Sequence, residues 1–299
     1  MTVSEMRPMD MGEVLDRSFQ TLRRHFGVLF ATAVIGFLPL LILYLVMGTP
    51  YALATPSQPG APAIGGALIF LLLVSMLMMA VLWGALAAQV GAHVTGDVVA
   101  VGNGFKAGFR SLLRMIGAGI LVYFVMLGLG IAVALIGMAI GGVGALTGSR
   151  TLADLLLFLG FVVPGVVALV IGLSLAFLTV PALVIEQLGP MKALGRANQL
   201  AKGGRLRVCA IAILAYLLVM LPAFGLPFLL GFGSTLLNPQ AAGQVSATHL
   251  YLYQAIMIVT SAVTTPFMVA TMVFTYYDRR VRREGYDVEL ASASVATPE

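Results

Sequence analysis

Long apolar segments that alternate with short basic segments are the feature that most constrains how this chain folds. Six apolar segments lie at residues 27–47, 66–90, 116–140, 155–182, 208–230 and 250–276. Each reaches the roughly 20 residues that an α-helix needs to cross about 30 Å of hydrocarbon. Since 60% of the residues are hydrophobic and only 10% are charged, a soluble fold would have too little polar surface to cover its core. The sequence therefore predicts an all-α integral membrane protein with six transmembrane helices.

The positions of the basic residues predict how these helices are oriented. Of the 17 Lys and Arg residues, 16 fall in four segments: before the first apolar segment, between the second and third, between the fourth and fifth, and after the last. Only Arg150 is left for the other side. Because basic residues near the ends of membrane spans stay cytoplasmic, we expect both termini in the cytoplasm.

This topology predicts one membrane domain over residues 1–299. Residues 1–26 would form a cytoplasmic interfacial helix, and residues 27–277 the six-span bundle. Residues 278–299 would form a cytoplasmic tail that is first basic and then disordered.

A weak internal repeat predicts further helices that lie in the membrane interface. Apolar and small residues between Gly12 and Gly27 recur 90 residues later between Gly102 and Gly117, with the i, i+4, i+7 spacing of one helical face. A looser third copy begins at Gly189. The unit would be one interfacial helix followed by two spans, used three times. Chance similarity between segments of biased composition is the alternative.

The basic residues of these interfacial helices form a candidate binding face. Its members are Arg23, Arg24, Lys106, Arg110, Arg114, Lys192 and Arg196. Each Lys or Arg near an anionic membrane surface contributes on the order of 1 kcal/mol of attraction, so the expected partners are anionic lipid headgroups or a membrane protein. The alternative is that this charge bias serves only to orient the chain during insertion.

The threonines of the last apolar segment form a candidate polar path. Thr260, Thr264, Thr271 and Thr275 share one helical face. They either line a substrate cavity or donate hydrogen bonds to helix carbonyls and neighbouring helices. No Asp, Glu, Lys or Arg lies near the middle of any span, which argues against a proton-coupled pump.

Small residues predict where helices pack closely, within one chain or between the subunits of a homo-oligomer. They lie at Ala80, Gly84, Ala88 and Ala92, and at Gly137 and Gly141. A further group, Gly102, Gly104 and Gly108, only approximates a dinucleotide-binding pattern, so we expect it to form the flexible entrance to an interfacial helix. The single cysteine, Cys209, suits a buried packing position.

No set of residues in the sequence predicts catalysis. His25 and His93 are expected near the inner face and His249 near an outer loop, so the three cannot form one metal site. The sequence contains no H-E-x-x-H, G-x-S-x-G or phosphate-binding loop. We therefore expect no enzyme activity, no cofactor and no metal. Nucleic acid is also not an expected partner, because the basic residues are not interleaved with aromatic ones.

Four short stretches carry a family resemblance. They are RPMDMGEVLD at residues 7–16, VPALVIE at 180–186, GPMKALGRA at 189–197 and YYDRRVRREGYD at 276–287. Together they resemble the bacterial multispan family related to the membrane domain of glycerophosphoryl diester phosphodiesterases. The departure is at residues 195–197, where relatives tend to show a denser basic and serine pattern. The resemblance implies a bacterial plasma-membrane module without the catalytic domain, like stand-alone members of unknown function.

Within these stretches, Pro181, Glu186, Asp278 and Arg280 form a candidate structural motif. Glu186 would order the adjacent basic helix by pairing with Arg196 or Lys192, or Asp278 would pair with a neighbouring arginine. The alternative is that these acids are solvated in the membrane interface.

These observations favour a non-catalytic accessory or scaffold protein that binds anionic lipid or a membrane partner at its basic cytoplasmic face. The alternative is a small-molecule transporter or lipid flippase component whose path follows the threonine face. Prolines inside several spans keep this alternative open, because broken helices expose backbone groups to ligands in transporters.

Overall fold

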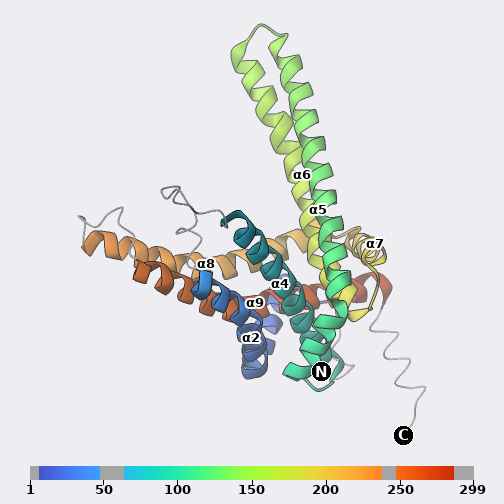
Figure 1. The fold of residues 1–299 in the computed structure, drawn as a ribbon. Coiled ribbons are helices and arrows are strands. Elements are labelled where there is room, and N and C mark those ends of the chain that lie inside the picture. The colour runs from blue at the N-terminus through green and yellow to red at the C-terminus, as the bar shows by residue number, and fades with distance from the viewer. Residues whose placement is uncertain (1–6, 48–63, 238–246, 286–299) are drawn as a thin grey trace.

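Helices make up all the regular secondary structure in the part of the chain that the computed structural model describes, residues 7–47, 64–237 and 247–285. In chain order they are α1 (Met11–Arg24), α2 (Phe26–Met47), α4 (Ile64–Thr95), α5 (Val101–Ala145), α6 (Arg150–Ile185), α7 (Pro190–Ala201), α8 (Arg205–Leu237) and α9 (Ala247–Glu284) (Figure 1). The predicted all-α class is confirmed for these residues.

Five helices, α4, α5, α6, α8 and α9, contain segments long and apolar enough to cross a membrane. A sixth span results if α1 and α2, which meet at an angle of 85°, are taken together. Each of the six predicted apolar segments coincides with one long helix, and most of these helices extend beyond the predicted ends. In particular, α9 continues to Glu284, so the start of the predicted tail is helical. The remainder of that tail, from residue 286, lies outside the described residues.

The first and third predicted interfacial helices are separate elements, but the second is not. α1 ends at the sharp turn into α2, and α7 begins with Gly189 as N-cap and Pro190 in the first turn. Residues 102–117 instead belong to α5, which runs without a break for 45 residues. The physical reason is that α7 is separated from the following span by Gly203, whose φ of 74° lies in the left-handed region that ends helices, whereas no residue with positive φ interrupts α5.

The three segments bury corresponding faces. Val14, Ser18 and Thr21 are buried in α1, Gly104, Gly108 and Ser111 in α5, and Ala193, Ala197 and Leu200 in α7. Each set has the spacing i, i+4, i+7, so each segment packs one narrow stripe of mostly small residues against its neighbours. The phenylalanines beside these stripes point outward, since Phe19 is 58% exposed and Phe109 is 57% exposed.

Glycines let α4, α5 and α6 pack closely. A Cβ atom on Gly84 would lie 2.6 Å from the Ser111 hydroxyl, and one on Gly108 would collide with the Val81 carbonyl oxygen. In the α5–α6 hairpin, a Cβ on Gly137 would lie 2.7 Å from the Phe161 ring. The predicted small-residue faces therefore pack within one chain. The expected flexible entrance at Gly102, Gly104 and Gly108 is wrong, because Gly104 and Gly108 are buried within α5 against α4.

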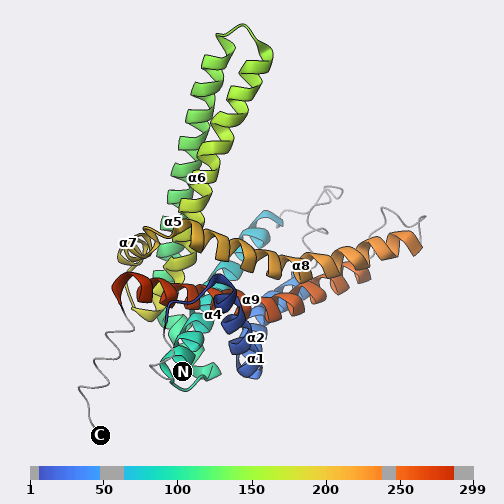
Figure 2. The same cartoon turned by 180° about the vertical axis from the view of Figure 1, so that it is seen from behind.

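The core lies where α2, α4, α6, α7, α8 and α9 converge, near the basic segments. Its largest fully buried side chains include Leu82, Phe177, Ile211, Phe274 and Tyr276. From this region the α5–α6 hairpin projects away from the other helices, while α8 and α9 run side by side in a different direction (Figures 1 and 2). Cys209 is buried, in agreement with its predicted packing role.

The close approach of α4 and α5 predicts a sharp difference between two glycine substitutions in α5. We expect Gly108→Ala to lower the midpoint of thermal unfolding in detergent, because the new methyl group would force the two helices apart. Gly128→Ala is the matched control, since a Cβ at Gly128 would meet no atom within 4 Å. Because alanine favours helix more than glycine does, the control should leave the midpoint unchanged or raise it. Equal midpoints for the two variants would contradict the close packing.

Candidate functional site

Segments that are far apart in the sequence meet at the basic end of the molecule. The N-terminal segment before α1, the end of α6, α7, the start of α8 and the end of α9 are joined there by hydrogen bonds and ion pairs. Figure 2 shows the C-terminal end of α9 beside α7. Two charged clusters account for most of these bonds, and we name them after the carboxylate at the centre of each.

The Glu186 cluster joins α6, α7 and α9. Glu186 terminates α6, and its carboxylate accepts hydrogen bonds from Arg196 Nε at 3.0 and 3.1 Å and from the Tyr276 hydroxyl. Arg196 also donates from Nη2 to Glu284 at 2.9 Å, and Arg280 Nε lies 3.7 Å from Glu186. Of the two partners predicted for Glu186, Arg196 and Lys192, the structure has Arg196 in that position.

The two carboxylates affect the protonation of Arg196. Its hydrogen bond to Glu284 is the largest effect, and the pairing with Glu186 adds to it. Together they raise the pKa of the guanidinium above its ordinary value, although partial burial opposes this shift. The guanidinium therefore stays charged and bridges α6 to α9 through α7.

The Asp278 cluster fastens the N-terminal segment to α8 and α9. The Asp278 side chain is 0% exposed, and its Oδ1 accepts hydrogen bonds from the backbone N–H of Met9 at 2.9 Å and from Arg282 Nε at 2.9 Å. Arg207 Nε lies 3.4 Å from Asp278 Oδ2. Both arginines also donate to the Met9 carbonyl oxygen. Asp278 therefore has the neighbouring arginine that the sequence predicted, and a second, distant one in Arg207.

Arg279 completes the attachment of α7. Its Nε donates to the Leu200 carbonyl oxygen at 2.9 Å and its Nη2 to the Lys202 carbonyl oxygen at 3.1 Å. A cation at this position satisfies carbonyl groups that the end of a helix leaves without a partner. Gly204 leaves room for the guanidinium, because a Cβ there would collide with it.

The seven residues of the predicted binding face fall into two groups. Arg196 belongs to the Glu186 cluster, and Arg114 donates from Nη1 to the Gln187 carbonyl oxygen at 2.7 Å. The other five are exposed and have no hydrogen bond or ion pair with any described residue. They are Arg23, Arg24, Lys106, Arg110 and Lys192. We call these five residues the free basic face.

The predicted structural motif divides between the two clusters. Glu186 and Arg280 belong to one and Asp278 to the other, while Pro181 is buried inside α6. Arg207, Tyr276 and Glu284 were not among the site residues predicted from the sequence. Tyr276, Arg280 and Glu284 follow one another at intervals of four residues, so this helical face was available as a signal. Arg207 had no comparable signal, because its partner lies 71 residues away.

The hydroxyl groups of the predicted polar path all donate to carbonyl oxygens of their own helix. The acceptors are four residues earlier in each case, and the four donors are Thr260, Thr264, Thr271 and Thr275. Thr271 and Thr275 are fully buried. The geometry agrees with the alternative interpretation of hydroxyls that bond helix carbonyls.

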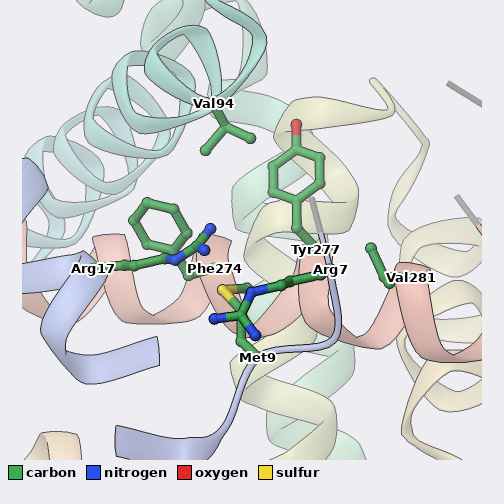
Figure 3. A pocket seen from close by; sticks show the side chains of 7 residues that line it. All are labelled: Arg7, Met9, Arg17, Val94, Phe274, Tyr277 and Val281. Carbon is green, nitrogen blue, oxygen red and sulfur yellow. The ribbon is translucent and has the colours of Figure 1, made fainter. Parts of the chain in front are cut away.

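A small cavity lies between the N-terminal segment and α9 (Figure 3). Its lining consists of Arg7 and Met9 of the N-terminal segment, Arg17 of α1, Val94 of α4, and Phe274, Tyr277 and Val281 of α9. Its volume of about 10 Å³ holds about one water molecule, so it is a packing gap with no room for an organic ligand.

A metal centre has no basis in the described residues. They contain no group of three or more His, Cys, Asp or Glu side chains that could hold a metal ion. Two of the histidines do meet, since His25 Nε2 lies 3.0 Å from His93 Nδ1. This agrees with their predicted place near the same face, but two ligands do not make a structural metal site.

The family model described as a domain of unknown function, DUF7847, matches residues 9–279. The chain belongs to the DUF7847 family. No curated protein and no solved structure shows significant similarity to it. The DUF7847 range contains Met9, Glu186, Arg196, Arg207 and Asp278, so it includes the central residues of both clusters. It ends before Arg282 and Glu284.

The burial of Asp278 predicts that it stabilises this DUF7847 protein. We expect Asp278→Asn to lower the free energy of unfolding by about 2–3 kcal/mol, because it leaves two arginines without their carboxylate. The value is below that of a fully buried pair, since Arg207 and Arg282 keep 20% and 33% of their side-chain surface exposed. Thermal unfolding in detergent would measure the change. Asp154→Asn, at an exposed acid without an ion pair among the described residues, is the control. Similar midpoints for both variants would contradict the role of Asp278.

Proposed function

We propose that the protein is a non-catalytic multi-pass membrane module, an accessory or scaffold protein that binds anionic lipid headgroups at its basic cytoplasmic face. The observation that carries this proposal is the free basic face. Its five cations come from three separate segments, α1, α5 and α7, and none of them is neutralised by a described residue. A phosphate-bearing surface is a suitable counterion for such a face.

The contrast with the internal arginines strengthens this proposal. Arg196, Arg207 and Arg282 pair with buried or half-buried carboxylates and hold helices together. Basic residues with a purely structural role would be expected to form ion pairs of this kind. The five residues of the free basic face form none with the described residues. A membrane-protein partner with an acidic surface would satisfy the same charges, and the lipid experiment below distinguishes it.

We propose that the protein lies in the bacterial plasma membrane with both termini in the cytoplasm. The contact between Met9 and Asp278 supports this, because it brings the described N-terminal segment and the end of α9 to the same side. Arg150 lies at the turn between α5 and α6, at the far end of the projecting hairpin (Figure 1). The excess of basic residues at the opposite end supports a cytoplasmic position for that end.

Two proposals concern the origin of this arrangement. A threefold repeat of an interfacial segment and a two-span hairpin is supported by the shared i, i+4, i+7 burial of α1, the start of α5, and α7. Kinship with the membrane domain of glycerophosphoryl diester phosphodiesterases is supported only by the four resembling stretches, two of which contribute Glu186 and Arg196 to one cluster.

The transporter or flippase alternative has no comparable support, because the threonine hydroxyls donate hydrogen bonds to carbonyl groups of their own helix.

The proposed orientation predicts which side chains can be labelled from each side of the membrane. In a Cys209→Ser background, Arg150→Cys should react with an impermeant maleimide in spheroplasts, and Lys106→Cys should react only in inside-out vesicles. Both positions are exposed, so burial does not protect either from labelling. Labelling of Lys106→Cys in intact spheroplasts would overturn the orientation.

The free basic face predicts a loss of anionic lipid on charge removal. We expect the double variant Lys106→Gln and Arg110→Gln to bind phosphatidylglycerol about 10- to 30-fold more weakly, since each cation contributes on the order of 1 kcal/mol. Native mass spectrometry of the detergent-purified protein would record the bound lipid. Arg150→Gln is the matched control, because it removes an exposed arginine at the opposite end. Unchanged phosphatidylglycerol binding in the double variant would overturn the lipid proposal. A second protein that stays bound to the purified chain in place of lipid would favour a membrane-protein partner.

A further inference from the structure

A second pocket lies between the end of α4 and the start of α5, apart from both charged clusters. It has a volume of about 200 Å³ and is open to the surface. Its polar wall contains Gln89, Asp97 and Asn103, and its apolar wall contains Ala88 and Ala92. This volume is larger than a single water molecule or metal ion requires and fits a small organic group.

The side chain of Gln89, one of the residues that line this pocket, carries an acceptor without a partner among the described residues. Its Nε2 donates to the Thr32 hydroxyl oxygen at 2.7 Å and to the Ala100 carbonyl oxygen at 3.2 Å. Thr32 can only accept, because its own hydrogen is donated to Val28. A flipped amide would place its oxygen against two acceptors, so the orientation is fixed. Gln89 Oε1 is then buried without a donor among the described residues, on a side chain that is 2% exposed.

A glycine keeps Gln89 in this position. A Cβ atom on Gly104 would lie 2.5 Å from Gln89 Nε2 and 2.8 Å from its Cδ. Any larger residue at position 104 would therefore push the amide away from its two acceptors. The pocket thus depends on the close approach of α5 to α4.

Asp97 adds a negative charge to the same wall. It is exposed, and its Oδ2 accepts a hydrogen bond from the Thr95 hydroxyl at 2.6 Å. It forms no ion pair with a described residue, although basic side chains dominate this end of the molecule. Gly96, with φ of 85°, makes the turn that places Asp97 beside the pocket. The wall therefore offers a carboxylate, a buried amide oxygen and the side-chain amide of Asn103.

We propose that this pocket binds the primary ammonium group of a phosphoethanolamine headgroup. An ammonium group has three N–H donors and no acceptor, which matches the three oxygen-bearing side chains of the wall. The two methylene groups of ethanolamine would pack against Ala88 and Ala92.

The phosphate of such a headgroup has its own partners on α5. Lys106 and Arg110 follow Asn103 at i+3 and i+7, so they lie on the same helical face, about one and two turns further along. The site therefore combines an acceptor pocket for an ammonium group with two cations for a phosphate. This inference rests on the proposed binding of lipid at the cytoplasmic face and names a headgroup class for one part of it.

The test compares headgroups that differ in their nitrogen donors. The full chain in detergent is titrated with short-chain phosphatidylethanolamine, phosphatidylcholine and phosphatidylglycerol, and with free phosphoethanolamine, by calorimetry or native mass spectrometry. The trimethylammonium group of phosphatidylcholine has no N–H donor, so we expect phosphatidylethanolamine to bind at least about tenfold more tightly. Equal affinity for the two zwitterionic lipids would overturn the inference, as would a complete absence of phosphatidylethanolamine binding.

Variants assign the preference to the pocket. Asp97→Asn should weaken phosphatidylethanolamine binding about tenfold, whereas phosphatidylglycerol binding should stay the same or strengthen, because a negative charge beside Lys106 and Arg110 is removed. Asp154→Asn is the matched control and should change neither. Gly104→Ala should weaken phosphatidylethanolamine binding in the same way without removing a charge. If that variant does not fold, the exposed Asp97 still provides the test. An unchanged preference in Asp97→Asn would overturn the inference.

The outcomes for this inference and for the proposed function are separate. Phosphatidylglycerol binding that depends on Lys106 and Arg110, without a phosphatidylethanolamine preference, would retain the lipid-binding function and reject the ammonium site. A preference that depends on Asp97, without phosphatidylglycerol binding, would retain the ammonium site and reject general binding of anionic lipid. Free phosphoethanolamine that binds as tightly as the lipid would support the site and identify a soluble amine as its ligand.

Discussion

The buried carboxylate of Asp278 is the point on which the basic end of this molecule depends. A single side chain accepts a hydrogen bond from the main chain at Met9 and pairs with Arg207 and Arg282, so it connects three segments that are distant in sequence. Burying this carboxylate is unfavourable unless every bond to it is made. Its two arginines also bind the Met9 carbonyl oxygen, so the ion pairs and the position of the N-terminal segment support each other. The Glu186 cluster repeats this arrangement for α6, α7 and α9.

These two clusters also determine which cations remain without a carboxylate partner among the described residues. Arginines that face a carboxylate are used to hold helices together, and Arg114 is used to hold the turn after α6 at Gln187. The cations left over lie on the outward sides of α1, α5 and α7, beside the exposed rings of Phe19 and Phe109. Exposed cations next to exposed aromatic rings suit the interface of a membrane, where the rings enter the headgroup region and the charges meet phosphate.

The sequence predicted the long helices well because their signal is local. Runs of apolar residues and the absence of charge are properties of consecutive residues, and each predicted span coincides with a helix. Arg196 was one of the two partners that the sequence allowed for Glu186, and the two residues are only ten apart. Prediction from the sequence failed for features that depend on contacts between residues distant in the chain. Nothing near Arg207 indicates Asp278, and the flexibility predicted for the glycines at 104 and 108 is wrong because distant residues of α4 pack against them. The second interfacial helix was wrong for a local reason, the lack of a helix stop before its span.

The outward surface of the α5–α6 hairpin explains why the polar contacts concentrate at one end. Large apolar side chains such as Tyr123, Leu135 and Phe158 are exposed along it, and the two helices bury little beyond the stripe of glycines between them. Contiguous apolar surface of this kind is unstable in water but stable in lipid. A helix pair in lipid gains little from apolar contact with its neighbours, because lipid tails are equally apolar. Close glycine packing and the polar bonds at the basic end must therefore hold the helices in register. The Gln89 pocket is an example of the close glycine packing, since Gly104 packs against Gln89, and Asp97 lies just beyond the end of α4.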